Sequence, residues 1–321
     1  MKKASLFFLV ALSLFVGCGR EDKPVATPTE KSDLPLYRTE GARLLKNECE
    51  WEFRGTNKMS VFGVDFSEPA AWGMDIVREC IDMRLTTDEM LQAIVDEARR
   101  FGLVVILTAF WWDNDALPGG KTPYPQCQLL GAVPSQDPRF NAVQARRRQI
   151  AALFKNQSDV WFGVWNEPYD WRKETTADAE QWLKDARLMV DNIRSVGADN
   201  IIVLCGNAMG QGHEPFLEKG AELLAGRKNI VFDIHAYRTY WDVPRTEIEK
   251  RLKALKESNI APVIIGEFAA NGDHPYLPIM DACRSTRTTL LAWLWGQYKE
   301  PFKSKYKSYC REPRNSGCSN G

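Results

Sequence analysis

Short apolar runs alternate with longer amphipathic segments along the chain from about residue 50 onward. Eight of the runs are rich in Val, Ile, Leu or Trp and apolar on both faces, a pattern that favours buried strands of a parallel sheet. These predicted strands cover 51–55, 74–78, 103–110, 160–166, 200–205, 230–235, 262–267 and 290–295. Between them, apolar residues recur at helical spacing, most clearly in 87–100, 141–154, 177–196 and 245–258.

The order of strand then helix repeats eight times, and this order separates two kinds of α/β fold. A doubly wound sheet would usually place a glycine-rich phosphate turn after its first strand, and the sequence has none there. A closed barrel of eight such units takes about 250 residues. We therefore predict an α/β protein with a single (β/α)8 TIM barrel over residues 41–321.

The N-terminal segment has the features of an export signal. Two lysines precede the apolar run 6–16, which is too short to span a bilayer. Cys18 follows the run directly, as in a bacterial lipobox, so we expect 1–18 to be a lipoprotein-type signal peptide with Cys18 lipidated. The alternative is a plain cleaved signal with an incidental cysteine. Residues 19–40, polar and rich in Pro and Thr, are predicted to form a flexible tether.

Composition limits the partners. The 42 Lys and Arg residues equal the 42 Asp and Glu residues, so the chain lacks the positive charge that grips nucleic acid. Only three histidines occur, too few for the usual zinc centres, and we expect no metal or other cofactor. With 44% hydrophobic and 26% charged residues, the chain resembles ordinary globular enzymes. We expect a monomer, exported to the bacterial cell envelope and held at the membrane by its N-terminal lipid.

Seven cysteines remain besides Cys18, and an oxidising compartment permits some of them to pair. Because seven is odd, at least one stays free. Cys205 follows an apolar run and is expected to be a small buried residue. Among the remaining six, the short spacing between Cys310 and Cys318 makes that pair the disulfide we predict.

Polar and aromatic residues follow the apolar runs directly, where turn-forming residues would be more usual. In a (β/α)8 barrel the carboxyl ends of the strands meet at one face, and the loops there carry the chemistry. The residues at or just beyond the predicted strand ends are Arg78, Phe110, Asn166, Glu167, His235, Tyr237, Glu267, Trp293 and Trp295. Such a ring indicates one shared site.

Two acids in this ring, Glu167 and Glu267, each end an apolar strand. A single Glu in such a place is often a helix cap or an ion-pair partner. As a pair, the two suit the cleavage of a glycosidic bond. That reaction needs one carboxylic acid to protonate the leaving oxygen and one carboxylate on the other side of the anomeric carbon.

The residues around both acids resemble known motifs. Trp165-Asn166-Glu167-Pro168 and Ile265-Gly266-Glu267-Phe268 resemble the fourth- and seventh-strand motifs of retaining glycosidases of the large (β/α)8 clan. The chain is similar above all to glycoside hydrolase family 5. The likeness continues in the right order through 53–57, Val77-Arg78, His235-x-Tyr237 and 292–295.

The resemblance implies a retaining endo-β-glycosidase that hydrolyses β-1,4-linked polysaccharide, glucan or mannan, by double displacement. Glu167 would be the general acid/base and Glu267 the nucleophile that forms a covalent glycosyl-enzyme. Arg78 and Tyr237 would stabilise the charged form of Glu267.

The resemblance also implies residues that bind the substrate. Asn166 would bind the sugar 2-hydroxyl, and His235 would orient Glu167 or the sugar. Trp293 would form the floor on which the sugar stacks, with Trp295 as the alternative. Three of the supporting residues have a structural alternative: Arg78 could be a surface residue of the second loop, His235 an interior histidine and Trp293 part of the barrel core.

One position departs from the family pattern. Family members carry a histidine at the end of the third strand, where this chain has Phe110, which predicts an altered subsite beside the scissile bond. Further aromatic residues in the predicted loops, which would stack on sugars or anchor the loops, are Trp111, Trp112, Trp171 and Trp241. The rival hypothesis is a cell-surface glycan-binding lipoprotein without turnover. A metal-dependent hydrolase would need more His and Asp at the strand ends.

Overall fold

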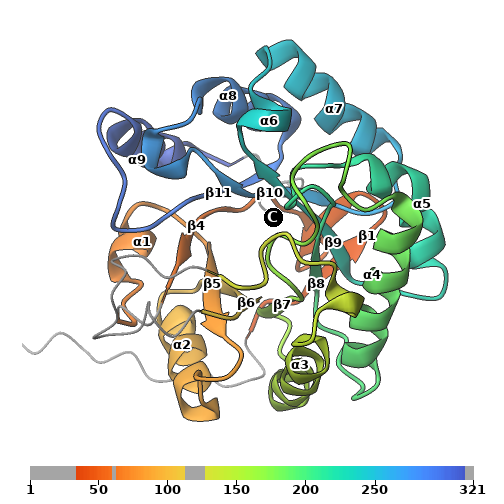
Figure 1. Ribbon diagram of the computed structural model, residues 1–321. Coiled ribbons are helices and arrows are strands. Elements are labelled where there is room, and N and C mark those ends of the chain that lie inside the picture. Colours follow the sequence, from red (N-terminus) through yellow and green to blue (C-terminus); the bar gives the residue numbers. More distant parts are fainter. Residues whose placement is uncertain (1–33, 60–62, 113–126, 315–321) are drawn as a thin grey trace, which may run out of the picture.

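The computed structural model describes residues 34–59, 63–112 and 127–314. Its eight parallel strands close into one barrel in the order β10-β11-β4-β5-β6-β7-β8-β9 (Figure 1). The barrel strands are β4 (Arg54–Lys58), β5 (Ile76–Asp82), β6 (Val104–Phe110), β7 (Val160–Gly163), β8 (Ile202–Cys205), β9 (Ile230–Ala236), β10 (Val263–Phe268) and β11 (Thr289–Ala292). The predicted (β/α)8 barrel is therefore confirmed, although β4 begins three residues after the predicted start and β7 ends three residues early.

Helices surround the barrel and connect its strands (Figure 1). They are α1 (Ser67–Ala71), α2 (Asp88–Arg100), α3 (Phe140–Phe154), α4 (Ala179–Arg194), α5 (Glu214–Leu224), α6 (Arg238–Trp241), α7 (Arg245–Glu257), α8 (Leu277–Thr286) and α9 (Phe302–Arg311), with 3-10 turns η4 (Pro134–Gln136) and η5 (Ala270–Gly272). In the described part of the chain, none of the helices is both long and apolar enough to cross a membrane.

Local signals explain where the long helices begin. The side chain of Thr87 caps α2 by accepting a hydrogen bond from the backbone N–H of Met90. Asp178 caps α4 in the same way from Gln181. Each cap satisfies a backbone donor that the first helical turn leaves free.

A small antiparallel sheet precedes the barrel and was not predicted. Its strands are β1 (Tyr37–Glu40), β2 (Arg43–Lys46) and β3 (Cys49–Glu50). Tyr37 and Leu44 are buried in the same cluster as Phe53 of the barrel. The prediction of a flexible tether over 19–40 is therefore wrong for residues 37–40, because these apolar side chains order the segment against the barrel.

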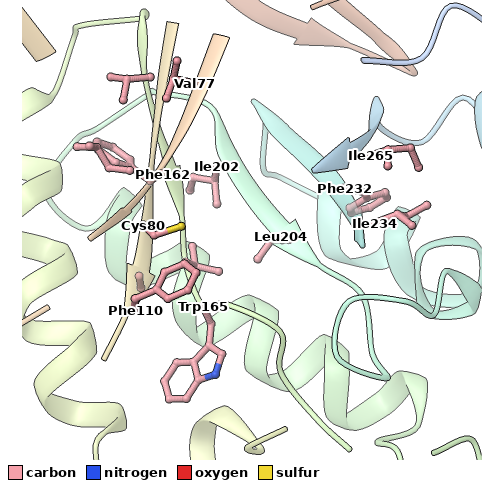
Figure 2. Packing of buried hydrophobic residues seen from close by; sticks show 14 of the residues in the cluster. Val77, Cys80, Phe110, Phe162, Trp165, Ile202, Leu204, Phe232, Ile234 and Ile265 are labelled. Atoms are coloured by element: carbon pink, nitrogen blue, oxygen red, sulfur yellow. The ribbon is translucent and has the colours of Figure 1, made fainter. Parts of the chain in front are cut away.

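Alternation along the strands sorts side chains into two environments. In β9, Val231 packs in a cluster with residues such as Ile76 and Ile264, whereas Phe232 and Ile234 belong to a larger cluster that also contains helix residues. Figure 2 shows Phe232 and Ile234 side by side in that larger cluster. Successive strand residues face opposite sides. Residues 231, 233 and 235 therefore share the inner face, which changes from apolar to polar toward the carboxyl end.

The cysteine predictions have mixed outcomes. Cys205 is a free, buried thiol, as predicted. Cys310 is also a free thiol, so the predicted Cys310–Cys318 disulfide is wrong: Cys310 faces the core from α9 and is buried there. Cys49 is the described cysteine that is disulfide-bonded. The predicted signal peptide 1–18, its Cys18 and Cys318 lie outside the described residues.

Candidate active site

The predicted site residues come together at the carboxyl ends of the barrel strands. A cleft of about 410 Å³ opens there and is lined, among others, by Asn166, Glu167, Tyr237, Glu267 and Trp293. Arg78 on β5 and His235 on β9 are fully buried directly behind this lining and contact the two acids. Strands that are far apart in the sequence thus contribute to one site.

A β-bulge turns Glu267 toward the cleft. In the pairing of β10 with β9, Ile265 lies opposite Ile234 and Glu267 opposite His235, so Gly266 is an extra residue. Without the bulge, strict alternation would place Glu267 on the outer face with Ile265. Glycine is required here, because a Cβ atom on residue 266 would lie 2.0 Å from Oδ1 of Asp233.

Glu167 reaches the cleft by a different route. Strand β7 ends at Gly163, whose carbonyl oxygen accepts a hydrogen bond of 2.7 Å from the buried Arg147 of α3. The chain then leaves the sheet, and Glu167 takes a left-handed conformation with φ of 46°. Such a φ is unfavourable for residues other than glycine, and strain of this kind concentrates at functional sites.

Arg78 connects Glu267 with Asn166, the residue that directly precedes Glu167. Its guanidinium donates to Oε1 of Glu267 at 2.8 Å and to Oδ1 of Asn166 at 2.6 Å. It also donates to Oδ1 of Asn57 on β4 at 2.8 Å. Arg78 is completely buried, and a buried positive charge is costly unless it is paired and hydrogen-bonded in this way. The alternative of a surface arginine is excluded.

Glu267 receives several stabilising contacts. The phenol of Tyr237 donates to Oε2 of Glu267 at 2.9 Å, and Nδ1 of His235 lies 3.5 Å from Oε1. Burial raises the pKa of Glu267 to about 7, and the charge of Glu167 also raises it. The contacts from His235, Arg78 and Tyr237 act in the opposite direction. Glu267 is therefore ionised above neutral pH and protonated in acid.

His235 lies between three carboxylates. Its Nδ1 is 2.7 Å from Oε1 of Glu167, and its Nε2 is 3.5 Å from Oδ2 of Asp233. Burial alone would lower the pKa of His235, but the charges of Glu267 and Asp233 raise it well above its ordinary value. The charges around His235 therefore favour its protonated form beside Glu167.

Asp233 was not singled out from the sequence. It is fully buried beneath His235, 3.7 Å from Nε of Arg78. Burial opposes its charge, yet His235 and Arg78 lower the pKa of Asp233. Asn57, which bonds Arg78, was also missed. For Asp233 the sequence did offer a signal. It is a polar residue inside an apolar strand, two positions before His235 and therefore on the same face.

The aromatic residues divide into lining and support. Trp293 lines the cleft, whereas Trp295 borders a neighbouring hollow and packs 4.8 Å from Trp72, between ring centres. Trp112 and Phe110 line the cleft with their rings 4.7 Å apart. Trp241 is buried, so its ring is not available to stack on a sugar. Its Nε1 instead donates to the carbonyl of Gln211 and anchors that loop.

Two groups of described residues have the donors and spacing for a metal ion. They are Glu167, His235 and Glu267, and Cys205, Asp233 and His235, with ligand atoms within 4.8 Å of one another in each group. The guanidinium of Arg78 lies 2.8 Å from Glu267 and 3.7 Å from Asp233. This fixed positive charge, together with cationic His235, repels a further cation.

Comparison with known proteins identifies the family of the chain. The family model described as cellulase (glycosyl hydrolase family 5) matches residues 65–299, well over half of the chain. The chain belongs to glycosyl hydrolase family 5. The manganese-dependent endoglucanase Eg5A of Phanerodontia chrysosporium is 27% identical over 113 residues, and endoglucanase EG-II of Hypocrea jecorina is 32% identical over 98 residues. These matches cover 33% and 28% of this chain, and 28% and 22% of the respective relatives.

Solved structures of other proteins share the fold. A β-mannanase from Streptomyces thermolilacinus matches with a TM-score of 0.65 and 20% identity over 83% of this chain and 87% of its own. A β-glucanase from Saccharophagus degradans matches with a TM-score of 0.63 and 16% identity over 90% and 97%. At such identities the likeness shows the barrel alone.

The contact between Asp233 and His235 predicts a change in the protonation of His235. In Asp233→Asn the shape is kept but the negative charge near Nε2 is lost, so the pKa of His235 should fall. Nitrogen chemical shifts of the imidazole, followed against pH by NMR, would measure this. The chain has only three histidines, which simplifies assignment.

Asp185→Asn is a matched control, because Asp185 is equally buried but bonds Tyr169 and Gln181. His235 should titrate in this control as in the wild type. If His235 loses its proton at the same pH in Asp233→Asn as in the wild type, the assigned role of Asp233 is wrong.

Proposed function

We propose that the protein is a retaining endo-β-glycosidase that hydrolyses β-1,4-linked glucan or mannan. The observation that carries the proposal is the pair of acids: an oxygen of Glu167 lies within 4.8 Å of one of Glu267. Carboxyl groups of retaining enzymes are about 5–5.5 Å apart, whereas inverting enzymes leave about 6.5–9.5 Å for a water molecule. The short separation supports direct attack by one carboxylate.

The contacts of the two acids support different roles. Glu267 accepts hydrogen bonds from Arg78 and Tyr237, which favour its ionised form and aim its oxygens. Burial raises the pKa of Tyr237 well above its usual range, so the phenol keeps its proton and donates. We assign Glu267 as the nucleophile that attacks the anomeric carbon to form the glycosyl-enzyme.

Glu167 is the acid/base in this proposal. It has no arginine contact among the described residues and instead faces cationic His235 at 2.7 Å. His235 can share its Nδ1 proton with Glu167, which then donates a proton to the leaving oxygen. In the second step, Glu167 takes a proton from water, and the hydroxide equivalent releases the sugar from Glu267 with net retention.

Asn166 and Trp293 complete the sugar site. The side-chain oxygen of Asn166 is engaged by Arg78, which leaves its NH₂ group to donate to the 2-hydroxyl. Such a bond strengthens in the transition state. Trp293 lines the same cleft and offers a ring for stacking. Phe110 offers an apolar ring where the family resemblance implies a histidine, so selectivity between glucan and mannan depends on fewer polar contacts there.

A panel of purified polysaccharides tests this function. At about pH 8 a carboxyl group with a pKa of about 7 is mostly ionised, so the wild type should release reducing ends from β-1,4-glucan or β-1,4-mannan. Release should decline as the pH falls through 7, because Glu267 becomes protonated. Xylan and mixed-linkage glucan complete the panel.

Glu267→Gln is the matched control, because it keeps the size of the side chain and removes its charge. It should reduce the release of reducing ends to background. A wild type that binds one of the glycans without cleaving any would favour the non-catalytic glycan-binding protein. Release by Glu267→Gln at the wild-type rate would remove Glu267 from the mechanism.

We also propose that the enzyme is a lipoprotein of the bacterial cell envelope, acylated at Cys18. The wild type should then partition with membranes and incorporate a labelled fatty acid. Cys18→Ser should lose the label, because serine has no thiol to acylate. A mature wild type whose mass lacks acyl chains would instead indicate a simple secreted enzyme.

A further inference from the structure

A second hollow adjoins the cleft. Its volume is about 360 Å³, which is within the range of small-molecule sites. Met59 lines both the cleft and the hollow, and Trp293 of the cleft is followed directly in the chain by Leu294 of the hollow. The two therefore lie side by side at the carboxyl ends of the strands. Other residues that line the hollow include Val64, Asp65, Glu68, Trp295 and Gln297.

The hollow and Glu167 lie on opposite sides of the barrel. The hollow is bordered by the segments that follow β4 and β11. In the closed order of strands, β11 is four strands from β7 in either direction, and Glu167 comes soon after β7 (Figure 1). Because the acid protonates the leaving oxygen, the departing sugar lies on the side of Glu167. The hollow is therefore on the side of the glycone, the part of the glycan that becomes bonded to Glu267.

Trp295 gives the hollow an aromatic wall that is held in place. Its ring centre lies 4.8 Å from that of Trp72 and 5.8 Å from that of Tyr298, with the planes inclined at 69° and 86°. Its backbone N–H donates to the carbonyl of Asn57 at 2.9 Å. The residue is nevertheless only half-buried. Part of the indole thus remains accessible in the hollow, where it can stack on the C–H groups of a sugar ring.

Glu68 gives the hollow an accessible acceptor. It belongs to α1, is exposed to solvent, and lines the hollow together with Trp295. The same two residues also line a smaller hollow next to it, so they are neighbours. The carboxylate of Glu68 has no hydrogen bond or ion pair with any residue that the structure describes. It is therefore free to accept hydrogen bonds from a ligand.

The charges around the hollow indicate the class of ligand. Of its two acids, Asp65 accepts from the N–H of Ser67 at 2.9 Å, whereas Glu68 is free. The hollow also contains Lys58, but this side chain is only 9% exposed and its Nζ donates to the carbonyl of Gly63 at 2.8 Å. Two carboxylates repel an anion. An aromatic ring beside a free carboxylate instead suits an uncharged sugar, whose hydroxyl groups donate.

We propose that this hollow binds a sugar unit of the glycone, beyond the unit that stacks on Trp293. Trp295 stacks on the ring of the bound sugar, and Glu68 accepts a hydrogen bond from one of its hydroxyl groups. The ligand is thus an uncharged β-linked oligosaccharide that extends from the cleft into the hollow. The inference rests on the proposed function, because the acid role of Glu167 defines the glycone side.

The test varies the length of the glycone and keeps the leaving group constant. 2,4-Dinitrophenyl β-glycosides with one or three sugar units release the same phenol, and only the longer one reaches the hollow. In the wild type, kcat/KM should be higher for the longer substrate. The ratio of the two kcat/KM values should fall about tenfold in Glu68→Ala, which loses the bond to a charged acceptor. Trp295→Leu, which keeps an apolar contact with Trp72 but removes the flat ring, should also lower the ratio.

Glu218→Ala is the matched control, because Glu218 is an exposed glutamate of α5 that does not line the hollow. It should keep the wild-type ratio, and Glu68→Ala should melt at the same temperature as the control. Three results overturn the inference while the glycosidase function stands. They are a wild type with equal kcat/KM for both lengths, an unchanged ratio in both hollow variants, and an equal loss on both substrates in these variants. A wild type that cleaves neither substrate overturns the proposed function itself.

Discussion

The site depends on one buried positive charge. Arg78 holds Glu267 and Asn166 with direct hydrogen bonds and lies 3.7 Å from Asp233. A guanidinium away from water requires negative partners, and removal of one partner from a buried ion pair costs about 3–5 kcal/mol. His235 adds a second positively charged group. Electrostatic attraction to Arg78 and His235 holds Glu167, Asp233 and Glu267 in place. Stability and the proposed chemistry thus depend on the same contacts.

Barrel geometry explains how these charges meet without exposing the core. The inner face of β9 passes from Val231 in the apolar layer to Asp233 and then to His235 at the cleft. The bulge at Gly266 brings Glu267 level with His235 on the neighbouring strand. A layer of apolar side chains therefore closes the barrel below, and the polar layer above it is open to substrate at one end.

The sequence predicts the elements that follow a repeated pattern and the residues with an unusual place in that pattern. It does not predict features that depend on tertiary packing between particular side chains. The eight strands follow from their apolar runs, and Glu167 and Glu267 from their places at strand ends. Asp233 was missed because its place in the strand indicates the face that it shares with His235 but not its contact with Arg78 on another strand. The bulge at Gly266 depends on contact with another strand. The sheet β1–β3 has short strands whose burial against the barrel is a tertiary effect.

The most direct measurement of the central claim is the identity of the residue that bonds to the sugar. An activated 2-deoxy-2-fluoro-β-glycoside slows release of the glycosyl-enzyme and allows the labelled peptide to be found by mass spectrometry. The account predicts one fluoroglycosyl group, attached to Glu267, and none in Glu267→Gln. A label on Glu167, or wild-type turnover of the substrate with no covalent label at all, would contradict it.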